Sequence, residues 1–252
     1  MTKKLEKHEL LITISLIVIY ILLNSFCMNN FGLTDIRSVL INGVFTSGII
    51  IFIIKNKLLD YYKLTSFPNP KKYLYFIPLL IIASINFWGG INISNNPIEI
   101  LCHILSMVFI GFLEEIIFRG FLFQMMSKDN LKTAIIVTSI TFGVGHIINL
   151  LNGADFIPTL IQILYCISAG YLFAIIVVKT NSLWPCIITH ILINAFSIFN
   201  NINFITTYIT PIVLIILPLI YVSYIKKNNA LSVVFSIYTK QEYTYHYYYY
   251  RY

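Results

Sequence analysis

The chain has 252 residues, of which 58% are hydrophobic and only 11% charged, and its formal net charge is +7. A soluble domain carries about 25% charged residues, so this composition excludes an ordinary soluble enzyme and is typical of an integral membrane protein. The positive charge does not indicate a nucleic-acid partner, because the basic residues flank apolar runs instead of gathering in one patch.

Apolar runs long enough to cross a bilayer divide the chain from end to end. A membrane-spanning helix needs about 20 predominantly apolar residues. Eight such runs occur, at residues 10–28, 36–54, 73–90, 98–125, 131–148, 156–178, 183–199 and 203–225. We therefore predict an all-α fold, a polytopic transmembrane helical bundle of about eight spans whose partner is the lipid bilayer.

The lysines between these runs fall on one side of an eight-span arrangement. That side contains Lys3, Lys4, Lys7, Lys55, Lys57, Lys63, Lys71, Lys72, Lys128, Lys132, Lys179, Lys226 and Lys227, whereas the opposite loops contain only Arg37. Cytoplasmic loops are enriched in Lys and Arg. The asymmetry predicts a multi-pass protein of the cell membrane with both termini in the cytoplasm.

Four regions follow from these patterns. We assign residues 1–97 to the first three spans, 98–199 to the helices that carry chemistry, 200–225 to the final span and 226–252 to a Tyr-rich cytoplasmic tail. The tail has low complexity and no helical period, so we predict that it is disordered. Heavy use of Ile, Asn, Lys, Tyr and Phe suggests an AT-rich genome and a bacterial source.

A small set of charged residues and histidines lies deep in the apolar runs, with one asparagine beside them. In chain order they are Glu114, Glu115, Arg119, His146, His190 and Asn194. A charge at the centre of a span costs roughly 2.5–3.5 kcal/mol on insertion scales, so the retention of several on three helices indicates function. His103 lies nearer the end of a run and has no partner motif, and we predict a structural role for it.

Helical spacing sorts these residues into pairs. Glu115 and Arg119 are four residues apart, so they share a helix face and are expected to form an ion pair. Glu114 is rotated by about 100° from its neighbour and is left without a local partner. His190 and Asn194 are also one turn apart and can direct two polar groups to one point.

The depth of these groups permits them to meet. Counted from the cytoplasmic ends at about 1.5 Å per residue, Glu114 lies roughly 15 Å into its span, His146 roughly 22 Å and His190 roughly 12 Å. Two mechanisms then remain open. Glu114 facing His146 could hold and deprotonate a water while His190 and Asn194 stabilise an oxyanion. Alternatively, Glu114, His146 and His190 could bind zinc with a water as fourth ligand, so the cofactor is either none or a divalent metal.

Three motifs carry a family resemblance. The stretches EEIIFRG, FGVGH and SLWPCIITHILIN resemble the E-E-x-x-x-R, F-x-x-x-H and H-x-x-x-N motifs of the CPBP family of intramembrane proteases, in order and on successive apolar runs. That family unites type II CAAX prenyl endopeptidases with bacterial proteins of bacteriocin processing and self-immunity. Its members are described both as metalloproteases and as glutamate-dependent proteases.

The resemblance implies an intramembrane endopeptidase. Glu114 and His146 would activate the water, His190 and Asn194 would stabilise the oxyanion, and Glu115 with Arg119 would support them. The expected partner is a hydrophobic or membrane-bound peptide substrate, with a role in bacteriocin maturation or self-immunity. The rival interpretations are a proton-coupled transporter and a non-catalytic immunity or scaffold protein.

Overall fold

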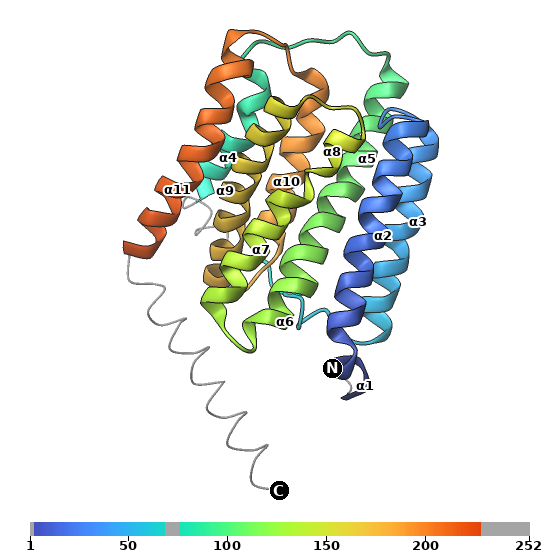
Figure 1. The fold of residues 1–252 in the computed structure, drawn as a ribbon, viewed down its shortest axis with the longest axis vertical. Coiled ribbons are helices and arrows are strands. Elements are labelled where there is room, and N and C mark those ends of the chain that lie inside the picture. Colours follow the sequence, from blue (N-terminus) through green and yellow to red (C-terminus); the bar gives the residue numbers. More distant parts are fainter. Residues whose placement is uncertain (1–2, 69–75, 228–252) are drawn as a thin grey trace, which may run out of the picture.

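The computed structural model describes residues 3–68 and 76–227, and within them the chain is helical, with no strand beyond an isolated bridge between Ile91 and Asn200 (Figure 1). The elements are α1 (Lys3–Lys7), α2 (Glu9–Asn30), α3 (Ile36–Lys55), α4 (Ile77–Ala83), η2 (Ser84–Phe87), α5 (Pro97–Glu115), η3 (Ile116–Leu122), α6 (Phe123–Ser127), α7 (Leu131–Gly145), α8 (Ile148–Leu151), α9 (Phe156–Thr180), α10 (Trp184–Phe196), η4 (Ser197–Phe199), η5 (Ile205–Ile209) and α11 (Thr210–Lys227). The predicted all-α polytopic bundle is confirmed.

Each of the eight predicted runs coincides with a helix, but two of these helices are shorter than the six candidate membrane spans. Six are long and apolar enough to cross a membrane, whereas Ile77–Phe87 and Trp184–Phe199 are shorter apolar helices. At about 1.5 Å per residue, Trp184–Phe199 extends roughly 24 Å, less than the ~30 Å of a hydrocarbon core. The start of the run at 73–90 and the predicted tail beyond Lys227 lie outside the described residues.

Side-chain caps fix where the helices of the site begin. Asn96 accepts a hydrogen bond from the Glu99 amide, and the Glu99 side chain accepts one from the Asn96 amide, which makes a capping box at the start of α5. Asn130 accepts from the Thr133 amide at 2.9 Å and starts α7. Such caps satisfy amide groups that have no partner within the helix. The two helices therefore begin at defined positions, which sets the depth of the residues further along.

Glycines allow the helices of the site to pack closely. α10 packs along α5 and α9 packs along α7. A Cβ atom on Gly111 would lie 3.1 Å from the Ile191 backbone nitrogen, and one on Gly143 would lie 2.8 Å from the Ile163 carbonyl oxygen. Small residues permit this approach between membrane helices. The close contacts hold the helices that carry the acidic motif and the histidines against one another.

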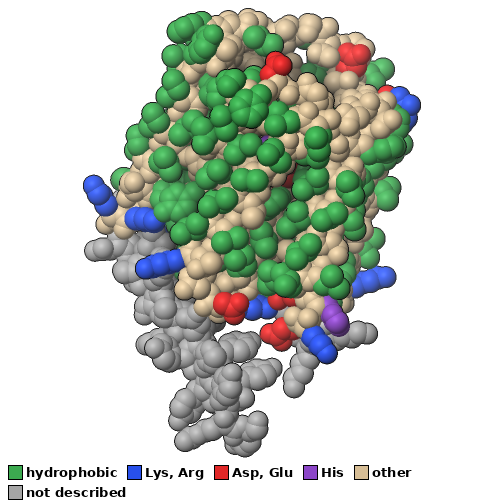
Figure 2. All heavy atoms as spheres, viewed as in Figure 1, with side chains coloured by type: hydrophobic (Ala, Val, Ile, Leu, Met, Phe, Trp, Pro, Cys, Tyr) green, Lys and Arg blue, Asp and Glu red, His purple; other side chains and the backbone are tan. Residues whose placement is uncertain are grey.

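The outer surface of the bundle is apolar. Figure 2 shows hydrophobic side chains over the middle of the visible face, with most Lys and Arg towards the end where the N-terminus lies in Figure 1. Only 17% of the apolar window of α2 and 22% of that of α11 is buried. Exposed apolar surface of this extent marks a surface that another apolar medium covers. The bundle is thus a multi-pass membrane protein with polar groups inside it.

Candidate active site

The acidic motif lies where a long helix changes its winding. Glu114 and Glu115 are the last residues of α5, and the chain continues without interruption into a π-helical segment, η3, that contains Arg119. π-Helical turns are rare and occur frequently at functional sites. Every residue of η3 is buried, so the charged motif sits in the interior of the bundle.

Glu115 and Arg119 form the ion pair that their spacing predicts. Arg119 Nη1 lies 3.0 Å from Glu115 Oε1, and both side chains are 0% exposed. The guanidinium carbon lies 4.0 Å from the centroid of the Phe142 ring, a cation–π contact. A Cβ on Gly170 would lie 3.1 Å from Arg119 Nη2, so the glycine leaves room for the guanidinium.

His190 lies between the two glutamates. Its Nε2 is 3.1 Å from Glu114 Oε2 and its Nδ1 is 2.8 Å from Glu115 Oε1. A carboxylate can only accept hydrogen bonds, so both contacts are satisfied together when both ring nitrogens carry hydrogen or when one carboxyl group is protonated. His190 on α10 thereby joins the supporting ion pair to Glu114, a link between helices that spacing along one helix does not reveal.

Glu114, expected to lack a partner on its own helix, has partners from two other helices. The Tyr20 hydroxyl on α2 donates a hydrogen bond to Glu114 Oε1, while His190 contacts the other oxygen. The Glu114 side chain keeps 12% of its surface exposed. Tyr20 is absent from the residues identified by sequence. The only signal for it in the sequence is a phenol in the middle of the predicted span at 10–28.

His146 approaches the site from the end of α7 but does not hydrogen bond to Glu114. It caps the helix, with Nδ1 3.1 Å from the Phe142 carbonyl oxygen and Nε2 3.6 Å from Cys166 Sγ. Because a carbonyl only accepts, Nδ1 donates and Nε2 can accept from the thiol. The Phe142 ring is 5.4 Å from the His146 ring and 5.7 Å from the His190 ring. The two histidines thus flank one aromatic side chain.

Asn194 lies one turn beyond His190, as predicted, and is partly buried. Its side-chain amide makes no hydrogen bond within the described part of the chain. Its backbone oxygen, in contrast, lies 3.2 Å from His103 Nε2 and accepts a bond from the Ser197 hydroxyl at 2.7 Å. His103 therefore ties α5 to the end of α10, in keeping with a structural role. The Asn194 amide keeps its donors available to another molecule.

The side chains predicted as zinc ligands are not arranged around a common point. Glu114 and His190 contact each other directly, and His146 turns towards Cys166. Over residues 3–68 and 76–227, no group of three or more His, Cys, Asp and Glu side chains is placed to hold a metal ion. The three residues would have to rearrange to bind zinc, so the steps derived below use the chain's own groups.

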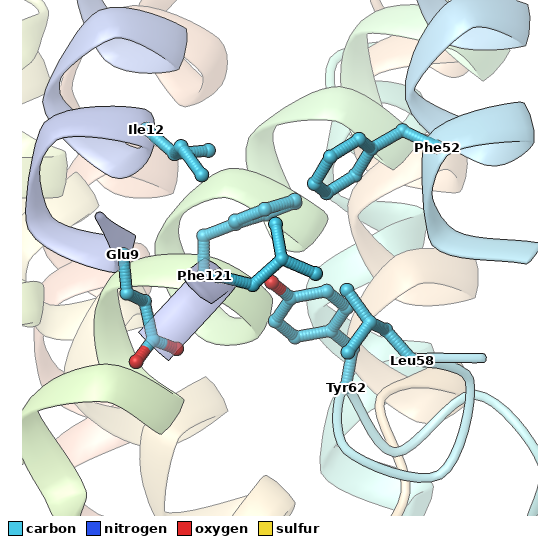
Figure 3. Close-up of a pocket in the computed structure, with 7 residues that line it drawn as sticks. Glu9, Ile12, Phe52, Leu58, Tyr62 and Phe121 are labelled. Atoms are coloured by element: carbon cyan, nitrogen blue, oxygen red, sulfur yellow. The ribbon is translucent and has the colours of Figure 1, made fainter. Parts of the chain in front are cut away.

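A small pocket opens near the N-terminal end of α2 and does not include the acidic site (Figure 3). It is lined by Leu5, Glu9, Ile12, Phe52, Leu58, Tyr62 and Phe121. Figure 3 shows the ring of Phe121 between Ile12 and Phe52, with the Glu9 carboxylate at the pocket margin. None of the predicted site residues lines this pocket. The pocket is therefore separate from the Glu114 site.

Comparison with known proteins identifies the central segment. Residues 96–196 match the family model described as type II CAAX prenyl endopeptidase Rce1-like. No curated protein and no solved structure matches the chain. The matched segment begins at the cap of α5 and ends with α10, so it contains every predicted site residue and leaves Tyr20 outside. Such a segment indicates an intramembrane protease. The CPBP resemblance of the three motifs is thus confirmed over residues 96–196, the segment that matches the Rce1-like family of type II CAAX prenyl endopeptidases.

Proposed function

We propose that this chain is an intramembrane endopeptidase in which Glu114 activates a water molecule for attack on a peptide bond. The observation that carries the proposal is the environment of Glu114. It is a partly exposed carboxylate inside a membrane bundle, aligned by His190 and Tyr20 beside a buried Glu115–Arg119 pair. Charged groups in spans usually have a function, and the matched segment is that of an endopeptidase family.

The chemistry follows from the donors and acceptors present. Glu114 takes a proton from water, and the oxygen of the water forms a bond to the carbonyl carbon of the substrate. The resulting oxyanion accepts hydrogen bonds from His190 and from the free amide of Asn194. When the C–N bond breaks, Glu114 returns the proton to the leaving amine. Before the reaction His190 Nε2 lies 3.1 Å from Glu114 Oε2, and during it the imidazole turns from this oxygen to the oxyanion.

The Glu115–Arg119 pair supports this site through His190. Glu115 Oε1 accepts from both Arg119 and His190, at 3.0 and 2.8 Å. A carboxylate that is itself held by a buried guanidinium gives the imidazole a fixed acceptor, as the orienting carboxylate does in other acid–base sites. Glu115 and Arg119 are therefore assigned supporting roles, and Glu114 the direct one.

The test is a Glu114→Gln variant that inserts normally and is assayed in proteoliposomes on internally quenched, leucine-rich peptides. Loss of a general base should lower turnover by roughly 10²- to 10⁴-fold. The matched control is Glu99→Gln, the same substitution at the opposite end of α5, which should retain turnover. Wild-type turnover in the Glu114 variant would refute the proposal. A proton-linked flux lost in that variant would favour a transporter instead.

A second measurement addresses the thiol beside His146. Cys166 Sγ and His146 Nε2 are 3.6 Å apart, and such a pair could supply a cysteine nucleophile. The proposal predicts that Cys166→Ala retains cleavage, because water is the nucleophile. Cleavage lost in this variant, with normal insertion, would replace the glutamate mechanism with a thiol mechanism.

A third measurement addresses the metal. Activity that survives exhaustive chelation, with no zinc found by elemental analysis, would remove the zinc alternative. Activity that chelation abolishes and added zinc restores would favour it.

A hydrophobic or membrane-bound peptide is the substrate class that best suits a carboxylate placed within the bundle. The link to bacteriocin maturation or self-immunity is proposed from the family resemblance. A neighbouring gene for a short peptide with a leader would supply a natural substrate to test. Protection of cells by a His190→Ala variant would instead support a non-catalytic immunity role.

A further inference from the structure

We propose that Tyr20 is a positioning residue of the active site, which extends the site onto α2 and beyond the family-matched segment. The inference deepens the proposed function and rests on it. Tyr20 is 6% exposed, and its hydroxyl donates to Glu114 Oε1. One candidate span, Ile36–Lys55, and one shorter apolar helix, Ile77–Phe87, lie between Tyr20 and the start of the matched segment. Three observations carry the assignment: the face on which Tyr20 lies, the attachments of its helix and the state of the Glu114 oxygens.

The buried face of α2 is a narrow, largely polar stripe. Its buried residues are Glu9, Thr13, Tyr20 and Cys27. At about 100° per residue these four lie within about 40° of one another. Of the other side chains of α2, Ile12, Leu16, Ile17 and Ile21 pack partly buried against the core, whereas Leu10, Leu11, Ile14, Ile19 and Leu22 are exposed. The most deeply buried positions of α2 thus carry mainly polar groups, with apolar contacts beside them, so the helix contributes to the polar interior as well as to hydrophobic packing.

Polar contacts attach α2 to the bundle on both sides of Tyr20. Towards the N-terminus, Glu9 accepts from Lys128 Nζ at 2.6 Å and from the Tyr61 hydroxyl at 2.6 Å. Towards the C-terminus, the Ser25 hydroxyl donates to Asn152 Oδ1 at 2.5 Å. These contacts reach the segment after α6, the turn after α3 and the end of α8. Tyr20, between them, is held at a fixed height against α5.

The two oxygens of the Glu114 carboxylate have different hydrogen-bond partners and therefore different roles in the proposed reaction. Oε1 is engaged by the phenol and Oε2 by His190. In the proposed reaction His190 must turn to the oxyanion, which frees Oε2 to take the proton of the water. Tyr20 then remains as the group that keeps the carboxylate plane aligned. Hydrogen bonds to a charged acceptor are stronger than neutral ones, so this contact suits that task.

The test is Tyr20→Phe, which keeps the ring and removes the hydroxyl. Turnover on the quenched leucine-rich peptides should fall roughly tenfold to a hundredfold, with KM unchanged, because the phenol contacts the base and not the substrate. The matched control is Tyr61→Phe. It also removes a tyrosine–glutamate hydrogen bond from α2, but at Glu9, and should leave kcat unchanged. An equal fall in both variants would mean that general attachment of α2 matters, and would overturn the assignment.

A measurement that does not depend on cleavage separates this inference from the proposed function. Tyr20→Phe should lower the thermal midpoint in detergent more in the wild type than in the Glu114→Gln background, because the bond to an ionised carboxylate is the stronger one. Equal shifts in both backgrounds would overturn the contact. Full kcat in Tyr20→Phe with none in Glu114→Gln would overturn the positioning role alone. Full kcat in Glu114→Gln would instead overturn the proposed function.

Discussion

Replacement of Arg119 by Met should destabilise the bundle more than any substitution at its surface. Both side chains of the Glu115–Arg119 pair are 0% exposed. The pair is also incompletely satisfied, since Glu115 Oε2, Arg119 Nε and Arg119 Nη2 are buried without a hydrogen-bond partner in the described residues. Removal of one partner from a buried pair costs about 3–5 kcal/mol, because the other charge stays buried. The free energy of unfolding of a protein is only about 5–15 kcal/mol, so the Arg119→Met variant should lose a large share of it.

The assay is thermal unfolding of purified variants in one detergent. For a chain of this size about 2–4 °C is lost per kcal/mol, which gives a decrease of roughly 6–20 °C. The matched control is Arg37→Met at the exposed Asp35 pair, where Arg37 is 59% and Asp35 25% exposed, and its thermal midpoint should change little because exposed ion pairs contribute little. A Glu115→Gln/Arg119→Met double variant should recover part of the loss, since no unpaired charge remains. Equal midpoints for Arg119→Met and Arg37→Met would refute the reasoning.

Two further predictions concern Gly170, which lies beside the Arg119 guanidinium, and Asp35, whose side chain caps the start of α3. Gly170→Val should cost about 1–3 kcal/mol and lower turnover, because a Cβ there would lie 3.1 Å from Arg119 Nη2; thermal midpoints and cleavage rates check it. Hydrogen bonds from Arg37 lower the pKa of Asp35 from 3.8 to about 2. A lowered pKa means that the ionised form stabilises the fold above about pH 4 and that this contribution is lost as the pH falls through 2. The difference in thermal midpoint between wild type and Asp35→Asn should therefore be full at pH 5 and vanish towards pH 2.

Hydropathy predicted the helices because a bilayer demands long apolar runs. The predicted run at 98–125 corresponds to a continuous helix from Pro97 to Ser127. The predicted run at 183–199 likewise corresponds to the helix Trp184–Phe199, although that helix is shorter than the six candidate spans. Hydropathy also did not predict the π-helical winding of η3. Its sequence, IIFRGFL, is mainly apolar, as that of an ordinary α-helical segment of a span would be. Helix existence was therefore predictable, whereas local winding was not.

Local spacing predicted only contacts within one helix. The Glu115–Arg119 pair follows from four residues of separation. The contacts of His190 with both glutamates join residues 75 or more positions apart, and spacing contains no information on them. Depth counting allowed Glu114, His146 and His190 to converge, but it could not say which pair would touch. The structure pairs Glu114 with His190, and His146 faces Cys166.

The location of Tyr20 bears on how this family segment can be studied. Residues 96–196 contain Glu114, Glu115, Arg119 and both histidines, yet one of the two groups that hold the Glu114 carboxylate comes from α2. A fragment limited to the matched residues would leave Oε1 of a membrane-buried carboxylate without its hydrogen-bond donor, and an unsatisfied buried acceptor is costly. The motifs therefore identify the chemistry, but the geometry of the base depends on a helix that the motifs do not include. Activity should be measured on a chain that retains α2.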